Sequence, residues 1–184
     1  MTNLSKSVAE SEVTITELMI PAYANFGGKV HGGILLSLMD KVAYVCASKY
    51  AQAYCVTVAV EGVEFLTPVE VGELVSLKAS VNYVGRTTMI VGIRVESLLP
   101  QSGTLKHTNS CYFTMAAKDD NGNLCEVPVL RIETEIQLRR FCEGKAIRRL
   151  SLQKRDFLKA NLEGIDMTER IAMTHGERVE LTIL

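Results

Sequence analysis

The chain has 184 residues, of which 47% are apolar and 22% are charged, and these shares are typical of a folded protein with a sizeable core. This length favours one domain with room for a shorter extension. Twenty Lys and Arg against 21 Asp and Glu give a formal net charge of -1, which argues against a protein wrapped along nucleic acid over its whole surface.

The cysteines and the N-terminal segment bear on the cellular compartment. Five cysteines occur without CxxC spacing, mostly inside apolar segments, so we expect reduced thiols and a cytoplasmic location. The first residues, MTNLSKSVAESEV, lack the apolar stretch of a signal peptide. The longest apolar segment is interrupted by Asp40 and Lys41, so no membrane-spanning helix is expected. The sequence therefore predicts a soluble protein with neither a membrane nor a nucleic-acid partner.

The first predicted elements are a strand, a glycine-rich loop and a helix. β-Branched residues alternate in VTITELMI, residues 13–20, and Pro21 ends this strand. The loop ANFGGKVHGG has four glycines in ten residues. It leads into a helix over residues 34–50, whose apolar positions recur every three and four residues, and we expect this helix to be buried on most of its surface. A strand follows at CVTVAV, residues 55–60, and continues through 63–65.

Three further strands are predicted over residues 74–84, 87–99 and 107–117, and short links containing Gly or Pro separate them. Short links favour antiparallel pairing between consecutive strands. One long helix followed by antiparallel strands predicts an α+β fold, with a curved antiparallel sheet wrapped around one long central helix. Pro128 is expected to mark the end of the sheet region.

The composition changes beyond Pro128. Residues 131–160 carry nine basic and four acidic residues, so we expect one or two amphipathic helices in a basic tail. A solvated helix face is a better explanation of these charges than a nucleic-acid site. The last six residues, VELTIL, have a β-like pattern without a predicted partner.

Asp40 is the first candidate for chemistry, because an unpaired carboxylate among apolar helix residues is costly. By helical spacing, Gly33, Ser37, Asp40 and Tyr44 form a small or polar stripe on the predicted helix. This spacing predicts that Asp40 faces a cleft and not the core. A structural role, as the ion-pair partner of Lys41 or of a nearby arginine, remains equally open.

The glycine-rich loop before the helix supports a ligand site. Gly27, Gly28, Gly32 and Gly33 allow close approach of a ligand to the backbone, and the N–H groups at the start of the helix can polarise a carbonyl oxygen. The Asn25 amide can hold a water molecule or stabilise an oxyanion, although a lone Asn more commonly has an ordinary turn role.

Several longer strings then identify a family resemblance. They are ANFGGKVHGGILLSLMDKVAY, CVTVAVEGVEFLTPVEVGELV, VNYVGRTTMIVGIRVE and HTNSCYFTMAA. In this order they resemble the hotdog-fold acyl-CoA thioesterases, specifically the cytosolic acyl-CoA hydrolase branch. The resemblance implies a hotdog acyl-CoA hydrolase domain over residues 12–128, followed by a basic, mainly helical extension over 129–184. It also implies hydrolysis of fatty acyl-CoA to free fatty acid and CoA.

The resemblance further implies specific roles for residues. Asn25 of one subunit and Asp40 of the partner subunit would form the active site, in an oligomer that is at least a dimer and is expected to be a hexamer of three dimers. The N–H groups of Gly32 and Gly33 would face the thioester carbonyl. The remaining substrate positions are Val58 and Ala59 beside the pantetheine arm, and Gly85, Arg86, Thr87 and Thr88 near the CoA phosphates.

Thioester hydrolysis needs mainly a positioned water, a carboxylate base and dipoles at the developing oxyanion. Asp40 can act as the general base, or it can attack directly and form a mixed anhydride. His31, His107 and His175 lack metal-ligand spacing, and no GxSxG motif is present. We therefore expect no metal and no cofactor, since CoA is part of the substrate and the product.

Three alternatives remain open. A hotdog hydratase or dehydratase would use His31 together with Asp40. A non-catalytic acyl-CoA-binding protein would bind the thioester without turnover, and a structural or partner-binding domain would have no affinity for CoA. The sequence also leaves the acyl chain length undetermined.

Overall fold

A computed structural model describes residues 5–182. The chain divides into two compact units, the first ending at Arg148 and the second beginning at Arg149. The elements of the first unit are β1 (Ser5–Ser7), a 3-10 turn (Ala9–Ser11), β2 (Val13–Leu18), a second 3-10 turn (Pro21–Tyr23), α1 (Gly32–Ala51), β3 (Tyr54–Phe65), β4 (Leu74–Val84), β5 (Thr88–Leu99), β6 (Thr104–Lys118), β7 (Val129–Arg131) and the first turns of α2 (Glu135–Leu162).

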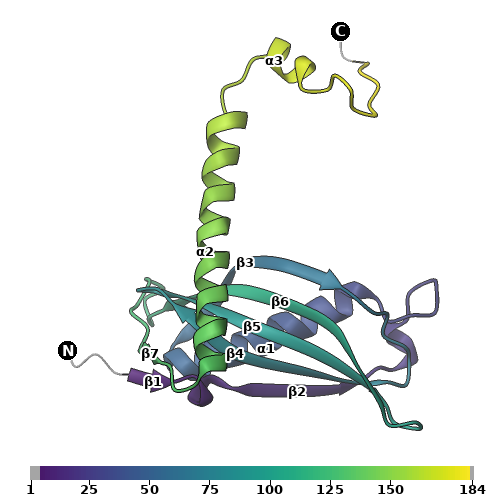
Figure 1. Ribbon diagram of the computed structural model, residues 1–184, viewed down its shortest axis with the longest axis vertical. Coiled ribbons are helices and arrows are strands. Elements are labelled where there is room, and N and C mark those ends of the chain that lie inside the picture. Colours follow the sequence, from purple (N-terminus) through teal and green to yellow (C-terminus); the bar gives the residue numbers. More distant parts are fainter. Residues whose placement is uncertain (1–4, 183–184) are drawn as a thin grey trace. The chain divides into compact units, whose positions relative to one another are not determined.

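The main sheet has five antiparallel strands in the order β2-β4-β5-β6-β3. Figure 1 shows this sheet curving around α1. The consecutive pairing of β4, β5 and β6 confirms the prediction from their short links, whereas β3 pairs with β6. The predicted α+β architecture is therefore confirmed, with β2 and β3 as the two edge strands.

α1 begins where His31 caps its first turn. The His31 Nδ1 atom accepts a 2.9 Å hydrogen bond from the Gly33 N–H. The helix ends at Gln52, which has a left-handed φ of 54°. The prediction that most of the helix surface is buried is wrong for the single chain. The sheet covers only one side of α1, and Leu36 and Tyr44 on the outer side are exposed.

The core lies between the buried side of α1 and the inner face of the sheet. Alternate residues of β4 point inward, and Leu77 and Val81 among them are fully buried. On α1, Met39 and Val42 are likewise fully buried. Burial of one such side chain contributes about 1.5–3 kcal/mol, so the one-sided contact is enough to fix α1 on the sheet.

The structure corrects three predicted boundaries. β2 ends at Leu18 instead of residue 20, because the Met19 backbone leaves the ladder to bond with Glu73 and Gly72. β6 begins at Thr104 instead of residue 107, because the ladder with β5 continues to the hairpin turn. β pairing does not stop at Pro128, since β7 follows it and pairs in parallel with β1.

The first turns of α2 pack on the face of the sheet opposite α1. The Phe141 ring lies 5.4 Å from the Tyr83 ring of β4, measured between centroids. Gly144 is buried, and a Cβ atom built there would lie 3.0 Å from the Tyr83 Cβ. Glycine therefore allows the close approach of α2 to β4, although it lowers the intrinsic stability of the helix.

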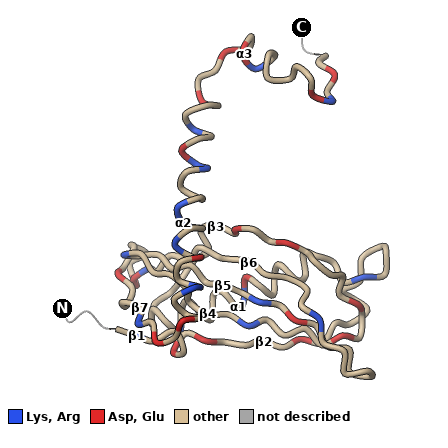
Figure 2. The backbone as a smooth tube through the Cα atoms, in the orientation of Figure 1, with Lys and Arg blue, Asp and Glu red and all other residues tan. Residues whose placement is uncertain are grey.

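The second unit contains the remainder of α2 and the short helix α3 (Met167–Ala172). These helices confirm the predicted helical tail, and Figure 2 shows Lys and Arg distributed along α2. Residues 179–182 form no strand, and the rest of the β-like ending lies outside the described residues. Within residues 5–182, no helix is both long and apolar enough to cross a bilayer.

Candidate active site

Asp40 lies on the outer side of α1, in contact with the edge strand β3. Its Oδ1 atom accepts a 2.6 Å hydrogen bond from the Thr57 hydroxyl. Asp40, Ser37 and Tyr44 are all exposed, which confirms that the polar stripe faces away from the core. Sequence reasoning did not select Thr57, because a threonine in a strand is ordinary and only the contact between α1 and β3 brings it to Asp40.

Exposed apolar side chains surround this pair. The rings of Tyr44 on α1 and Tyr54 on β3 contact edge to face, with centroids 6.2 Å apart. Other exposed apolar residues of these two elements are Leu36, Val45, Val58, Val60 and Phe65. An exposed apolar patch on a long edge strand is typical of a surface that another molecule covers.

The Asn25 loop is closed by the side chain of Asn25 itself. The Asn25 Oδ1 atom accepts hydrogen bonds from the Gly27 N–H, at 2.8 Å, and from the Lys29 N–H, at 3.2 Å. The Asn25 Nδ2 group has no acceptor among the described residues. Asn25 therefore combines the expected turn role with an amide donor that remains open to a ligand.

The two glycines at the start of α1 differ in their surroundings. The Gly33 N–H is already bonded to the His31 Nδ1 atom, whereas the Gly32 N–H has no partner among the described residues. A Cβ atom built on Gly32 would lie 3.3 Å from the Phe65 ring. Glycine at this position therefore allows the end of β3 to lie against the start of α1. Of the two N–H groups expected to face a carbonyl, the Gly32 group is therefore the one without a hydrogen bond inside the described chain.

Val58 and Ala59 follow Thr57 on β3. The register with β6 pairs Thr57 with Met115 and Ala59 with Thr114, which leaves Val58 as an extra residue in a bulge. The Val58 side chain is 60% exposed. Bulges free backbone groups and redirect side chains, so Val58 offers a place for backbone contacts with an extended ligand.

The turn from Gly85 to Thr88 joins β4 to β5. The Gly85 N–H donates a 2.7 Å hydrogen bond to the Thr88 carbonyl, and the Arg86 Nε atom lies 3.0 Å from the Glu126 carboxylate. Both side chains of this ion pair are largely exposed, so the pair contributes little stability. In Figure 1 this turn lies at the end of the sheet opposite the loop before α1. The predicted site residues therefore do not all lie together within one chain.

None of the buried cysteines is an activated nucleophile. All five are free, and burial raises the pKa of the Cys46 and Cys111 thiols to about 12.

Within residues 5–182, no three His, Cys, Asp or Glu side chains come together as a metal site. The His107 Nε2 atom lies 2.8 Å from the Asn109 carbonyl and 2.9 Å from the Ser110 hydroxyl.

An antiparallel sheet wrapped around one helix is the hotdog architecture, and the Asp40 carboxylate on the outer side of that helix is the candidate site. Residues 27–101 match the thioesterase superfamily. Protein VdlD of Helicobacter pylori is 43% identical over 82% of this chain and 84% of its own length. A solved hexameric acyl-CoA thioesterase is 31% identical with a TM-score of 0.79, over 87% of this chain and 99% of that one.

A second solved relative is the acyl-CoA hydrolase of Staphylococcus aureus, whose structure holds butyryl-CoA, CoA and CoA disulfide. It is 25% identical to this chain with a TM-score of 0.75, over 91% of this chain and 99% of that one. The chain therefore belongs to the family of hotdog-fold acyl-CoA thioesterases.

Proposed function

We propose that this acyl-CoA thioesterase hydrolyses fatty acyl-CoA to free fatty acid and CoA at a site that combines Asp40 and Thr57 of one subunit with Asn25 of another. The observation that carries the proposal is the 2.6 Å hydrogen bond from Thr57 to Asp40 on an exposed helix face. This bond occupies one lone pair of the carboxylate and directs it, while the other lone pairs can accept a proton from water.

In the proposed reaction, a water oxygen attacks the thioester carbonyl carbon while Asp40 takes the water proton. The developing oxyanion accepts hydrogen bonds from the Gly32 N–H and the Asn25 amide. The intermediate then expels the CoA thiolate, which takes up the proton that Asp40 removed from water, and the acyl group leaves as a carboxylic acid. These steps use only side chains, backbone groups and water, and CoA is part of the substrate and the product.

Asp40 can also attack the carbonyl itself and form a mixed anhydride, which water then hydrolyses. Single-turnover hydrolysis in ¹⁸O-labelled water tests the anhydride route, because water that attacks the Asp40 carbonyl of an anhydride leaves ¹⁸O on Asp40. We propose the general-base route, since the Thr57 hydrogen bond holds the Asp40 carboxylate in one orientation and leaves lone pairs that can accept a water proton. Mass spectrometry should then find no ¹⁸O in the peptide that contains Asp40, whereas ¹⁸O in that peptide would establish the anhydride.

The position of β3 supports a shared site. β3 is an edge strand, so a second copy can pair with it. Antiparallel pairing of two copies brings the Phe65 end of one β3 toward the Thr57 end of the other. Phe65 lies against Gly32 at the start of α1, directly after the Asn25 loop. This symmetry would bring Asn25 of one subunit toward Asp40 of its partner.

For the rest of the substrate, we propose that the pantetheine arm runs along the bulge at Val58 and Ala59. The CoA phosphates would then lie near the turn formed by Gly85, Arg86, Thr87 and Thr88. The exposure of Arg86 supports this, because its weak surface pair with Glu126 can be exchanged for a phosphate.

We further propose that the hotdog dimers assemble in the cytoplasm as a hexamer of three dimers, and the existence of a hexameric relative supports the number of subunits. The apolar side chains exposed on α1 and β3 support the dimer. The hydratase alternative finds no support at His31, because its Nδ1 atom caps α1 through Gly33.

The test begins with Asp40→Asn and Asn25→Ala, each of which should lower turnover by about two to four orders of magnitude without loss of folding. The two inactive proteins are then dissociated, mixed and reassembled. In each mixed dimer one of the two sites regains both native residues, so random mixing should restore about a quarter of wild-type activity. Inactive mixtures in which subunit exchange is demonstrated would disprove the shared site.

A further inference from the structure

The face of the sheet opposite α1 contains a cavity that the thioesterase reaction does not use. Its volume is about 430 Å³, within the usual range for small-molecule sites. The strands β2, β4, β5 and β6 form its floor, and the first turns of α2 form one wall. Every lining residue precedes Arg149, so the cavity lies entirely within the first unit.

The strand register explains why the floor is polar and hollow. On this face, one row across the sheet consists of Thr14, Lys78, Arg94 and Ser110. The next row runs from Ser80 through Gly92 to Tyr112. Gly92 has no side chain to fill the middle of this row, so space remains between polar neighbours.

Asn82 is directed into this space by a bulge in β4. The ladder pairs Val81 with Val91 and Tyr83 with Ile90, which leaves Asn82 as the extra residue. Asn82 is only 5% exposed, and its Oδ1 atom accepts a 3.0 Å hydrogen bond from the Ser80 hydroxyl. Its Nδ2 group lies over Gly92 at the cavity and has no acceptor among the described residues. This amide donor is held in place by the bulge and the Ser80 hydrogen bond, so a ligand in the cavity can accept a hydrogen bond from it.

The charges around the cavity favour an anion. Four lining residues are cationic, whereas two, Glu12 and Glu143, are anionic. Lys78 and Arg94 share the carboxylate of Glu96, which lies on β5 beside the cavity. Arg139 and Glu143, both on α2, form another ion pair among the lining residues.

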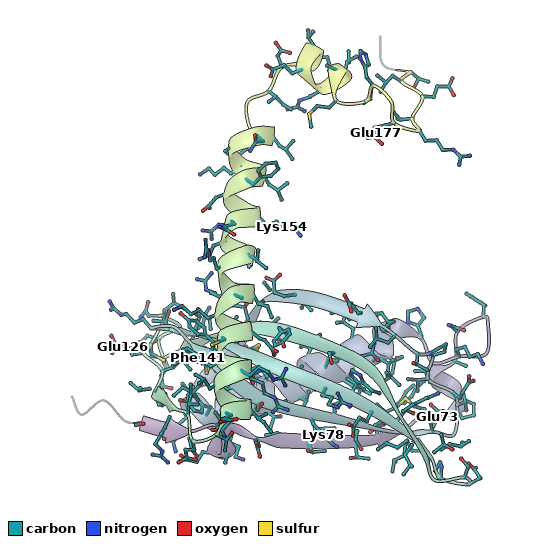
Figure 3. The ribbon with its side chains drawn as sticks, in the orientation of Figure 1. Glu73, Lys78, Glu126, Phe141, Lys154 and Glu177 are labelled. Carbon is teal, nitrogen blue, oxygen red and sulfur yellow. The ribbon has the colours of Figure 1, made fainter. Side chains whose placement is uncertain are left out.

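Arg140, the fourth cation, has no carboxylate partner among the described residues. Figure 3 labels Lys78 on the sheet and Phe141, the residue after Arg140, on α2. The Arg140 guanidinium and the Asn82 amide thus come from two different elements that line the cavity, α2 as its wall and β4 as part of its floor.

We propose that this cavity is a binding site for a small phosphate- or carboxylate-bearing molecule. The Arg140 guanidinium and the Asn82 amide donate hydrogen bonds to its anionic group, and Lys78 and Arg94 add positive charge at the other end. The site is separate from the acyl-CoA site, because the sheet lies between the cavity and Asp40.

The test is a calorimetric titration of the full chain at low ionic strength with pyrophosphate and, separately, with citrate. Saturable binding of one anion per chain is expected, and the tighter probe identifies phosphate or carboxylate as the preferred group. Arg140→Ala should weaken binding at least about tenfold. Asn82→Asp keeps the side-chain shape but presents a carboxylate to the anion, so binding should be lost. Lys145→Ala removes one charge from α2 outside the cavity and should change the affinity less than about twofold.

Gly92→Ala provides a second route if Asn82→Asp fails to fold. Gly92 lacks a positive φ, and the added methyl group would displace the end of the Asn82 side chain, so binding should again weaken. Absence of saturable binding to wild type, or equal losses in Arg140→Ala and Lys145→Ala, would overturn the proposal. A raised KM for acyl-CoA in Arg140→Ala would also overturn it, since the cavity would then belong to the substrate site.

Discussion

The Asp40 carboxylate on α1 and the Thr57 hydroxyl on β3 are joined by a 2.6 Å hydrogen bond, although the two residues belong to different elements. Thr57 Oγ1 also lies 3.5 Å from the Met115 Sδ atom, which holds the hydroxyl against the buried side of the sheet. Packing of β3 on β6 therefore fixes the direction of the donor, and the donor fixes the carboxylate.

Thr57→Val should lower kcat about 10- to 100-fold, because a hydrogen bond to a charged group is worth about 1.5–3 kcal/mol and the valine has nearly the same shape. Steady-state assays of thiol release from an acyl-CoA measure the effect. Thr57→Ser keeps the hydroxyl and is the matched control, with activity near wild type. Full activity of a folded Thr57→Val protein would remove the Thr57 hydroxyl from the mechanism.

Arg86→Ala should raise KM for acyl-CoA about tenfold and leave kcat unchanged, because a phosphate contact acts equally on bound substrate and transition state. The effect should shrink at high salt. Glu126→Gln removes the surface partner of Arg86 and should leave KM equal or lower. A short pantetheine thioester without the nucleotide should be hydrolysed equally by Arg86→Ala and wild type. Lower activity of the variant on that substrate would contradict the phosphate assignment.

Glu73→Gln should lower the free energy of unfolding by about 2–3 kcal/mol at pH 7, since it breaks a buried charge pair. The Glu73 side chain is 5% exposed, and its carboxylate lies 2.8 Å from the Lys106 ammonium and 2.5 Å from the Ser97 hydroxyl. Urea unfolding measures the loss. Glu70→Gln in the same loop removes an exposed pair with Lys29 and should cost at most about 1 kcal/mol. Equal losses in both variants would show that the burial of Glu73 has no special effect.

The same carboxylate predicts how stability depends on pH. Burial alone would raise the pKa of Glu73, but hydrogen bonds from Lys106, Ser97 and the Glu70 N–H lower the pKa below its ordinary value. The stabilisation is therefore complete above the unfolded pKa, about 4.3, and is lost as the pH falls through the folded pKa. Wild type should lose stability more steeply below about pH 5 than Glu73→Gln. Parallel curves for the two proteins would contradict this.

Gly144→Ala should destabilise the fold by about 1 kcal/mol, although alanine favours a helix by about the same amount. The added Cβ would lie 3.0 Å from the Tyr83 Cβ and 3.5 Å from the Asn82 Cβ, so α2 must move away from β4. Thermal and urea unfolding measure the change. Ala146→Gly, at an exposed position of the same helix, calibrates the propensity effect alone. A Gly144→Ala variant more stable than wild type would show that α2 shifts at no cost.

Local patterns in the sequence predicted the elements and much of the candidate site. The spacing of apolar residues predicted α1, and the short links predicted the pairing of β4, β5 and β6. The carboxylate among apolar helix residues identified Asp40 as a candidate for chemistry. These features could be predicted because helix and strand periodicity, turn residues and the cost of an unpaired charge depend on neighbours in the chain.

Only the tertiary structure decided which distant groups meet. Thr57 contacts Asp40 because β3 pairs with β6 at the sheet edge, and that pairing depends on long-range packing. The cavity with Asn82 and Arg140 likewise requires a bulge in β4, a glycine in β5 and the packing of α2 over both. Sequence periodicity determines which face of an element is apolar, but register, bulges and the element that covers each face follow from the free energy of packing the whole chain.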